Sequence, residues 1–447
     1  MAQNRLMWMA LLGSMTVAGS SIAQQQPTLK PLPSPVKSKP GVPTPIVSPS
    51  PVPAEEKLPA PPDSAAPAKE WLETDQPGVK LGVVAEFRGV QCTGIAVSKT
   101  GRVFACFPRW NEEFKHSLVE VAPDGSLTPY PNDVWNGFVE NDSTVRGMQF
   151  VCVQSIAVDD EDRLWVLDAA SPRMEGVNRS DLDGGGPKLI EFDLTTNKMR
   201  RMFRVLSNAA LAESYLNDFQ LDPVHNVAYV SDSGTGAIVV INTQTGATKR
   251  FLEQHSSTKA DAAYVPVIEG RELRGKDGKV PQIHVDGIAL DRKNGYLYYQ
   301  ALTGKRMFRI STKVLLDALP GRTLTGEQKN TISGAVEDMG ETVMTDGIIF
   351  DDAGNLYFSA LEQNGIVVRT PAGELKDLIK SPVIKWPDSF AIAAVRPGTA
   401  NGANDSAETS PQLYFTTSQI HLTDRFSADG TMPKEPYRVL RTKLFGR

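Results

Sequence analysis

Short apolar segments alternate with turns rich in Asp, Gly and Asn along residues 78–445 of the chain. One pattern recurs there: a small or acidic residue, a strand-forming run, a polar turn, and a second strand that often holds Leu-Tyr or Leu-Trp. Clear copies are QSIAVDDEDRLWVLD from Gln154, VDGIALDRKNGYLYYQ from Val285 and TDGIIFDDAGNLYFSA from Thr345. Alternating apolar positions on both sides of such a turn are typical of a β-hairpin that buries one face. Each copy is therefore predicted to be a β-hairpin.

The hairpin pattern occurs six times, beginning near residues 93, 154, 217, 285, 345 and 387. Most copies start about 60 residues apart, which leaves room for four strands and their loops. Repeats of this size without helical periodicity indicate propeller blades rather than a sandwich. LGVVAEF (81–87) is expected to pair with PYRVLRTKLF (436–445), because a blade shared by the two termini removes the free edges of a linear array. The predicted fold is all-β: a six-bladed β-propeller closed by N- and C-terminal strands, over residues 77–447.

The first 76 residues have a different composition. Arg5, an apolar run at residues 6–18 and small residues up to Ala23 follow the order of a secretory signal peptide, residues 1–23. The run is shorter than the roughly 20 residues of a membrane-spanning helix, so no transmembrane segment is expected after cleavage; an uncleaved anchor is the alternative. Residues 24–76 are proline-rich, and proline fixes φ and removes backbone donors, which predicts a disordered linker. A secreted or periplasmic protein is expected, and docking of a partner on the linker is left open.

Charge and cysteine content narrow the functional classes. The chain has 47 Lys and Arg against 52 Asp and Glu, a net charge of −5. A nucleic-acid-binding face needs an excess of basic residues, so no nucleic-acid partner is expected. Cys92, Cys106 and Cys152 lie in apolar, strand-like runs, where they are expected to be buried small hydrophobic residues.

The ends of the predicted hairpins locate a candidate site. The first strand of each blade lines the central channel of a propeller, so the residues that precede these strands are expected at one mouth of that channel. These residues are Gln154, Asp218, Asp286, Asp346 and Asp388. Asp168, Asp232 and His421 are expected around the same face, with Asn217 and His284 beside the ring and Trp386 as an aromatic wall.

Crowded carboxylates raise one another's pKa or attract a cation. The ring therefore predicts a site for a small-molecule ligand, an organic amine above all; Ca²⁺ held by oxygen ligands is an alternative, and no other cofactor or metal is expected. The competing hypothesis is structural: each Asp accepts hydrogen bonds from loop amides and joins neighbouring blades.

His284 and Asp286 are the candidate catalytic residues, because an imidazole or a carboxylate can exchange protons near neutral pH in a suitable environment. The candidate ligand-binding residues are Gln154, Asn217, Asp218, Asp346, Asp388, Trp386 and His421. The sequence contains no HExxH, CxxC or G-x-S-x-G motif, so the common signatures of zinc proteases, thiol redox sites and serine hydrolases are missing.

Several segments resemble the major royal jelly/yellow family, in particular its bacterial members labelled L-dopachrome tautomerase-related. They include RLWVLDAASP (163–172), SYLNDFQLD (214–222), AYVSDSGTGAIVVIN (228–242) and KWPDSFAI (385–392). The resemblance spans about residues 80–445. It implies a secreted six-bladed propeller that binds a small aromatic or amine compound at its channel, with dopachrome-type tautomerase activity as one option.

Two other functions stay open. A metal-dependent sugar-lactone hydrolase shares the six-bladed plan and an acidic channel, but it needs a Glu/Asn/Asp metal set of which Asn217 and the Asp ring supply only part. The third hypothesis is a non-catalytic secreted scaffold, held away from the envelope by the proline-rich linker.

Overall fold

The computed structural model describes residues 71–74, 79–110, 115–139, 146–177, 185–321, 323–394, 410–428 and 430–446. The expected signal peptide, residues 1–23, lies outside them, as does the expected linker, residues 24–76, apart from its residues 71–74. Those residues include strand β1 (Trp71–Glu73), which pairs with β2 (Lys80–Phe87). In the part of the chain that is described, no helix has both the length and the apolar character to cross a bilayer.

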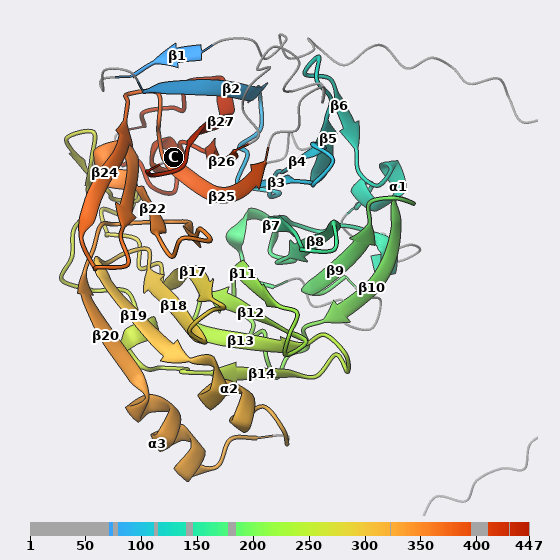
Figure 1. The fold of residues 1–447 in the computed structure, drawn as a ribbon, viewed down its shortest axis with the longest axis vertical. Helices are drawn as coiled ribbons and strands as arrows, with labels where there is room; N and C mark the ends of the chain where they lie inside the picture. Colours follow the sequence, from blue (N-terminus) through green and yellow to red (C-terminus); the bar gives the residue numbers. More distant parts are fainter. Residues whose placement is uncertain are drawn as a thin grey trace, which may run out of the picture. The chain divides into compact units, whose positions relative to one another are not determined.

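The chain folds into six antiparallel sheets arranged as the predicted six-bladed β-propeller (Figure 1). In blades 1 to 5 the four strands follow chain order across the sheet. Blade 1 has β3 (Gly94–Val97), β4 (Val103–Cys106), β5 (Leu118–Val121) and β6 (Leu127–Pro129); blade 2 has β7 (Val153–Val158), β8 (Arg163–Asp168), β9 (Lys188–Asp193) and β10 (Lys198–Arg204). Blade 3 has β11 (Leu216–Asp222), β12 (Val227–Asp232), β13 (Ala237–Asn242) and β14 (Thr248–Phe251); blade 4 has β17 (Val285–Asp291), β18 (Tyr296–Ala301), β19 (Arg306–Ser311) and β20 (Val336–Glu341). Blade 5 has β21 (Ile348–Phe350), β22 (Leu356–Ala360), β23 (Gly365–Arg369) and β24 (Leu375–Lys380).

The six predicted hairpins are confirmed, because each repeat forms the first two strands of a blade, as β7 and β8 or β17 and β18 do. The first strands contact one another around the channel in the order β3, β7, β11, β17, β21 and β25 (Pro387–Ala394), and β25 contacts β3. The repeat therefore determines both the hairpin and the innermost position of its first strand.

Blade 6 is shared by the two ends of the propeller, as the sequence predicts. Its strand order is β1, β2, β27 (Tyr437–Lys443), β26 (Pro411–Thr417) and β25. Strand β27 lies between β2 and β26, and its register with β2 runs from Gly82 opposite Arg441 to Phe87 opposite Tyr437. Closure of this kind leaves only the outer strand of each blade as an edge.

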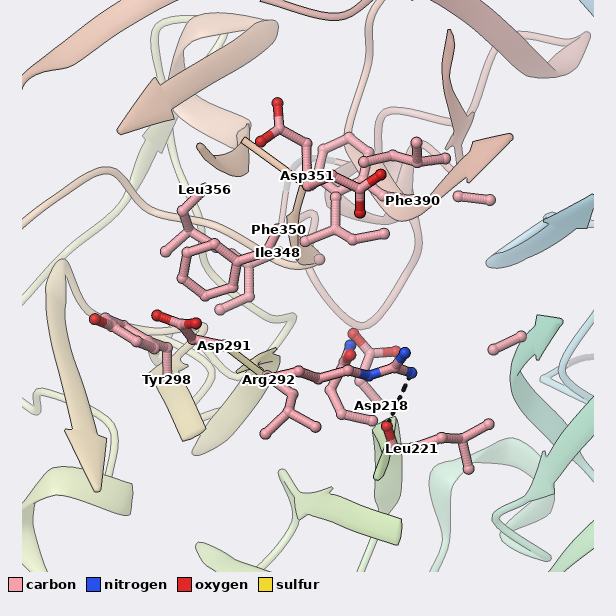
Figure 2. A pocket seen from close by; sticks show the side chains of 18 of the residues that line it. Asp218, Leu221, Asp291, Arg292, Tyr298, Ile348, Phe350, Asp351, Leu356 and Phe390 are labelled. Carbon is pink, nitrogen blue, oxygen red and sulfur yellow. Dashed lines mark hydrogen bonds between the residues drawn. The ribbon is translucent and has the colours of Figure 1, made fainter. Parts of the chain in front are cut away.

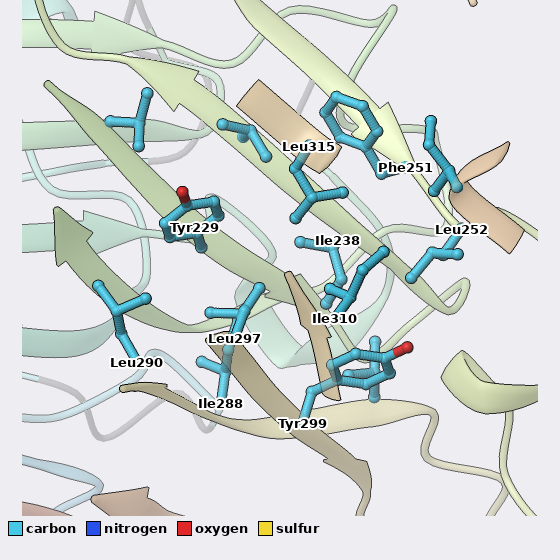
Figure 3. Close-up of a cluster of buried hydrophobic side chains, with 14 of the residues drawn as sticks. Tyr229, Ile238, Phe251, Leu252, Ile288, Leu290, Leu297, Tyr299, Ile310 and Leu315 are labelled. Atoms are coloured by element: carbon cyan, nitrogen blue, oxygen red, sulfur yellow. The ribbon is translucent and has the colours of Figure 1, made fainter. Parts of the chain in front are cut away.

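The hydrophobic core lies between blades, because each sheet is covered on both faces by its neighbours. Figure 3 shows the cluster between blades 3 and 4, where Tyr229 and Phe251 meet Ile288, Leu297 and Tyr299. Strand β12 is buried along its whole length, and its first four residues, Val227 to Val230, are apolar.

Cys92, Cys106 and Cys152 are buried and unpaired. Burial raises the pKa of Cys152 to about 12. A thiol of that kind stays protonated and behaves as a small hydrophobic side chain.

Between β19 and β20 the chain forms α2 (Thr312–Ala318) and α3 (Gly326–Gly334), outside the hairpin pattern. A second short insertion, the hairpin of β15 (Val267–Ile268) and β16 (Arg271–Glu272), lies in the connection from blade 3 to blade 4. This connection reaches blade 6, because Glu269 pairs with Lys385 at 2.6 Å.

Candidate functional site

Shifts of register at the start of the first strands determine which side chains face the channel. In β7, β11, β17 and β25 the register with the second strand shifts next to Gln154, Asn217, Asp286 and Asp388, respectively. A β-bulge of this type bends the strand and redirects a side chain. Asp346 directly precedes Gly347 and β21, the same Asp-Gly order as Asp286 and Gly287 in β17.

These five residues line one cavity of about 590 Å³. Its other walls combine aromatic and aliphatic side chains, which include Trp110, Tyr215, Ile283, Leu302, Trp386, Ile420 and Phe426, with polar and charged ones, which include Glu175, Glu213, Gln282 and Arg425. Of the residues named from the sequence, the cavity thus brings together Gln154, Asn217, Asp286, Asp346, Asp388 and Trp386. Tyr215, Ile420 and Phe426 come from connections between strands, where no repeat pattern marks them.

Three neighbouring blades each contribute one carboxylate to the cavity: Asp286, Asp346 and Asp388. They are 1%, 5% and 3% exposed. Trp386 Nε1 donates to Asp346 Oδ2 at 2.7 Å. Neutral neighbours lower the pKa of the other two carboxyls to some extent, Asn217 that of Asp286 and Ser418 that of Asp388, although the Ser418 hydroxyl itself donates to the Trp386 carbonyl at 3.2 Å. Among the residues that the structure describes, none is a hydrogen-bond partner of Oδ1 of Asp286 or of Oδ2 of Asp388. No Lys or Arg of the described chain forms an ion pair with any of the three.

Burial is the main reason that the pKa of each carboxyl is raised. It lifts the pKa of Asp346 to about 7, with a further contribution from the charge of Asp218. The pKa values of Asp286 and Asp388 are raised well above the usual range by burial and then by the neighbouring carboxylates. Mutual repulsion of buried like charges is relieved by protonation or by an incoming cation.

Asp168 and Asp232 have a different environment. Asp168 accepts hydrogen bonds from the backbone amides of Val151 and Cys152 and pairs with the buried Lys188 at 2.8 Å. Asp232 accepts from the Tyr215 amide and pairs with Arg250 at 2.7 Å. The structural hypothesis thus describes Asp168 and Asp232 but not the three carboxylates of the cavity.

Trp386 has a backbone conformation that is uncommon for a bulky residue. Its φ is 50°, in the left-handed region, and its side chain is fully buried. In this conformation the indole donates to Asp346, while its ring stacks on His421 at 5.8 Å between centroids. The residue therefore joins the acidic part of the cavity to its aromatic wall.

A row of uncharged side chains from other blades also lines the cavity. Gln154 Nε2 donates to Asn217 Oδ1 at 2.8 Å, and Tyr215 Oη donates to Gln154 Oε1 at 2.6 Å. Trp110 Nε1 donates to Tyr215 Oη at 2.9 Å. A ligand in this cavity meets carboxylates from blades 4 to 6 and amide and aromatic groups from blades 1 to 3.

Asp218 differs from the predicted arrangement. It follows Asn217, and it lines a second cavity, of about 1040 Å³, instead of the cavity of the other three carboxylates. Figure 2 shows it there with Arg292, whose guanidinium donates to the Leu221 carbonyl at 3.0 Å. Burial raises its pKa to about 6, and its charge still reaches Asp286, Asp346 and Asp388. In blade 3 the position equivalent to Asp286 is therefore Asn217.

Neither candidate histidine is among the residues that line the acidic cavity. His284 Nδ1 accepts a hydrogen bond from the Ala260 amide at 3.0 Å, and burial lowers its pKa. His421 lies behind Trp386, with Nε2 3.3 Å from Glu269 Oε2, and burial lowers its pKa to about 4. Among the described residues no group of three or more His, Cys, Asp or Glu side chains is arranged to hold a metal ion.

The chain is similar in sequence to several known proteins. Major royal jelly protein 5 of Apis mellifera is 23% identical over 232 residues, which cover 50% of this chain and 36% of that protein. Protein yellow of Drosophila melanogaster is 24% identical over 279 residues, 59% of this chain and 48% of that protein. The aligned regions thus span less than half of the length of these two relatives.

Among solved structures, a gluconolactonase from Xanthomonas campestris has a TM-score of 0.44 at 11% identity, covering 86% of this chain and 99% of that one. A likeness of that degree carries no functional argument. The sequence model described as "Major royal jelly protein" matches residues 151–389, more than half of the chain, and the match includes all three carboxylates of the cavity. With 16 curated proteins also matching, the chain belongs to the major royal jelly protein family.

Proposed function

We propose that the protein binds a small organic cation, of the arylalkylamine class, in the cavity of Asp286, Asp346 and Asp388. One observation carries the proposal: three buried carboxylates face one cavity, and two of their oxygens have no hydrogen-bond partner among the described residues. Arg425 also lines the cavity, but in the described part of the chain neither it nor any other Lys or Arg forms an ion pair with these carboxylates. Buried charges normally have a partner, because an unpaired one costs several kcal/mol. A protonated amine supplies both the charge and the donors.

The walls favour an aromatic body on that amine. Trp110, Trp386 and Phe426 offer ring surfaces, and Ile283 and Ile420 add aliphatic contact. A volume of about 590 Å³ lies in the range of small-molecule sites, which are largely apolar with a few polar groups that orient the ligand. Export of the protein, expected from residues 1–23, is part of the same proposal.

A dopachrome-type tautomerase step is a second candidate, favoured by the raised pKa of Asp286. A carboxyl group with that property can take a proton from carbon and return it to another atom of the same ligand. His284 is a weaker choice for this role, because its Nδ1 is occupied by the Ala260 amide and it does not line the cavity. The lactone hydrolase alternative gains no support from the described residues, in which no three or more His, Cys, Asp or Glu side chains are grouped so as to hold a metal ion.

The test is a thermal-shift and calorimetric titration with tyramine, a cation, and tyrosol, its neutral alcohol analogue. Tyramine is expected to raise the melting temperature and tyrosol to have little effect. Asp286→Asn should weaken tyramine binding by about 1–3 kcal/mol, the scale of a charge-assisted hydrogen bond, and leave the empty protein at least as stable.

Asp352→Asn is the matched control, because it removes an exposed charge that lines the second cavity. It should leave tyramine binding unchanged. Equal affinity for tyramine and tyrosol, or a large loss of stability in Asp286→Asn, would contradict the proposal.

A further inference from the structure

A chain of hydrogen bonds joins four uncharged side chains of three blades that line the cavity. Trp110 donates to Tyr215 at 2.9 Å, Tyr215 donates to Gln154 at 2.6 Å, and Gln154 donates to Asn217 at 2.8 Å. Gln154, Tyr215 and Asn217 are 4%, 9% and 7% exposed. All four side chains line the cavity beside Asp286.

The chemistry of the groups gives this chain one direction. An indole N–H can only donate, so Tyr215 Oη accepts from Trp110 and its single proton goes to Gln154 Oε1. The Gln154 amide nitrogen then faces Asn217 Oδ1. Only the Asn217 amide nitrogen is left as a donor, and it donates to Ser233 Oγ at 3.2 Å. Asn217 and Asp286 line the same cavity from adjacent first strands, and Asn217 lowers the pKa of Asp286 by hydrogen bonding.

We propose that Trp110, Tyr215 and Gln154 are positioning residues that hold the N–H of the Asn217 amide toward Asp286, and thereby set the pH range in which the cavity accepts a cation. The inference rests on the proposed function of this cavity. A hydrogen bond to a carboxylate favours its ionised form, whereas a reversed amide would place an oxygen against it. Asp286 needs such a donor, because burial and the charge of Asp346 both favour its protonated form.

Tyr215→Phe tests the inference, because it keeps the ring and removes both hydrogen bonds of the hydroxyl. Two quantities are measured: the pH midpoint at which tyramine affinity is lost on acidification, and the titration of Asp286 followed by carbon NMR of labelled aspartate. Both midpoints are expected to move upward by roughly half a unit to one unit, the scale of one hydrogen bond. Trp110→Phe should raise both midpoints by a smaller amount. This variant replaces Tyr215→Phe in the experiment if Tyr215→Phe does not fold.

Tyr299→Phe is the matched control. Tyr299 is buried between blades 3 and 4, and its hydroxyl is 2.8 Å from Ser257 Oγ, away from the cavity. Tyr299→Phe should lose about as much stability as Tyr215→Phe, and neither the pH midpoint of tyramine binding nor that of the Asp286 titration should move. Unchanged midpoints in both test variants, or an equal shift in Tyr299→Phe, would overturn the inference. If wild-type protein fails to bind tyramine, the proposed function fails, and the NMR titration still decides whether the chain acts on Asp286.

Discussion

Asp232 and Asp286 are buried aspartates of adjacent blades. Asp232 is neutralised by Arg250 and accepts several amide and hydroxyl protons, so its charge is part of the scaffold. Asp286 lies at the wall of a cavity with the neutral Asn217 as a neighbour that lowers its pKa, and within the described part of the chain its Oδ1 has no hydrogen-bond partner. Because the residue type is the same, the difference between the two aspartates comes from their surroundings. The surroundings therefore distinguish a structural carboxylate from a candidate binding carboxylate.

The raised pKa values predict how the stability of the empty protein changes with pH. Asp346 has a pKa of about 7 in the folded protein, against about 4 in an unfolded chain. The folded state therefore binds more protons between these values, and the free energy of unfolding falls as pH rises from about 4 to about 7. His421, with a lowered pKa of about 4, acts in the opposite direction below about pH 6.5, so a variant comparison is needed.

Asp346→Asn isolates the contribution of Asp346, because the amide oxygen can still accept from Trp386. The loss of melting temperature between pH 5 and 8 should be smaller in this variant than in the wild type. Parallel curves for the two proteins would mean that Asp346 titrates normally in the folded state.

The Asp-Gly dipeptides of blades 4 and 5 have a structural reason at the level of the strand. A Cβ on Gly347 would lie 2.1 Å from the Asp388 carbonyl oxygen, and a Cβ on Gly287 would lie 2.3 Å from that of Asp346. The Gly347 amide also donates to the Asp388 carbonyl at 2.9 Å. Glycine thus allows adjacent first strands to approach closely while the preceding Asp lines the cavity.

Gly347→Ala is expected to destabilise the protein by about 1–3 kcal/mol or more, because backbone must move to admit the methyl group. Chemical denaturation measures the change. Gly334→Ala in α3 is the control, since no atom lies within 4 Å of its added Cβ, and alanine is the better helix former. Equal stability of Gly347→Ala and the wild type would show that the blades can separate at this point without cost.

The first strands were predictable from the sequence, whereas their bulges were not. Alternation of apolar residues located β11, but the register shift beside Asn217 decides which residue meets the acidic cavity. A shift of one residue exchanges the two faces of a strand. Asp218 was therefore expected in a ring position that Asn217 occupies.

The pairing of N- and C-terminal strands in blade 6 closes the propeller and stabilises the whole molecule. Leu440 of β27 is fully buried and pairs with Val83 of β2 on one side and Phe415 of β26 on the other. Removal of β27 would leave one edge of β2 and one edge of β26 without a partner and open the cluster that blade 6 shares with blade 5.

A chain that ends after residue 435 is accordingly expected to lose its cooperative thermal transition, because two strand edges and their apolar side chains become exposed. Calorimetry and size-exclusion chromatography would detect this loss. A truncated protein that melts in one sharp transition near the wild-type temperature would show that five blades and part of the sixth suffice.

The amino-acid sequence by itself determined the repeat, the six hairpins and the pairing of the two ends, because strand alternation and turn residues are local properties of a chain. The cavity depended on the tertiary structure. The hydrogen bonds among Trp110, Gln154, Tyr215 and Asn217 join residues 61 to 105 positions apart. Whether an aspartate is neutralised, as Asp232 is, or keeps an unpartnered oxygen, as Asp286 does, depends on which distant side chains packing brings to it. Burial and charge then set its proton affinity.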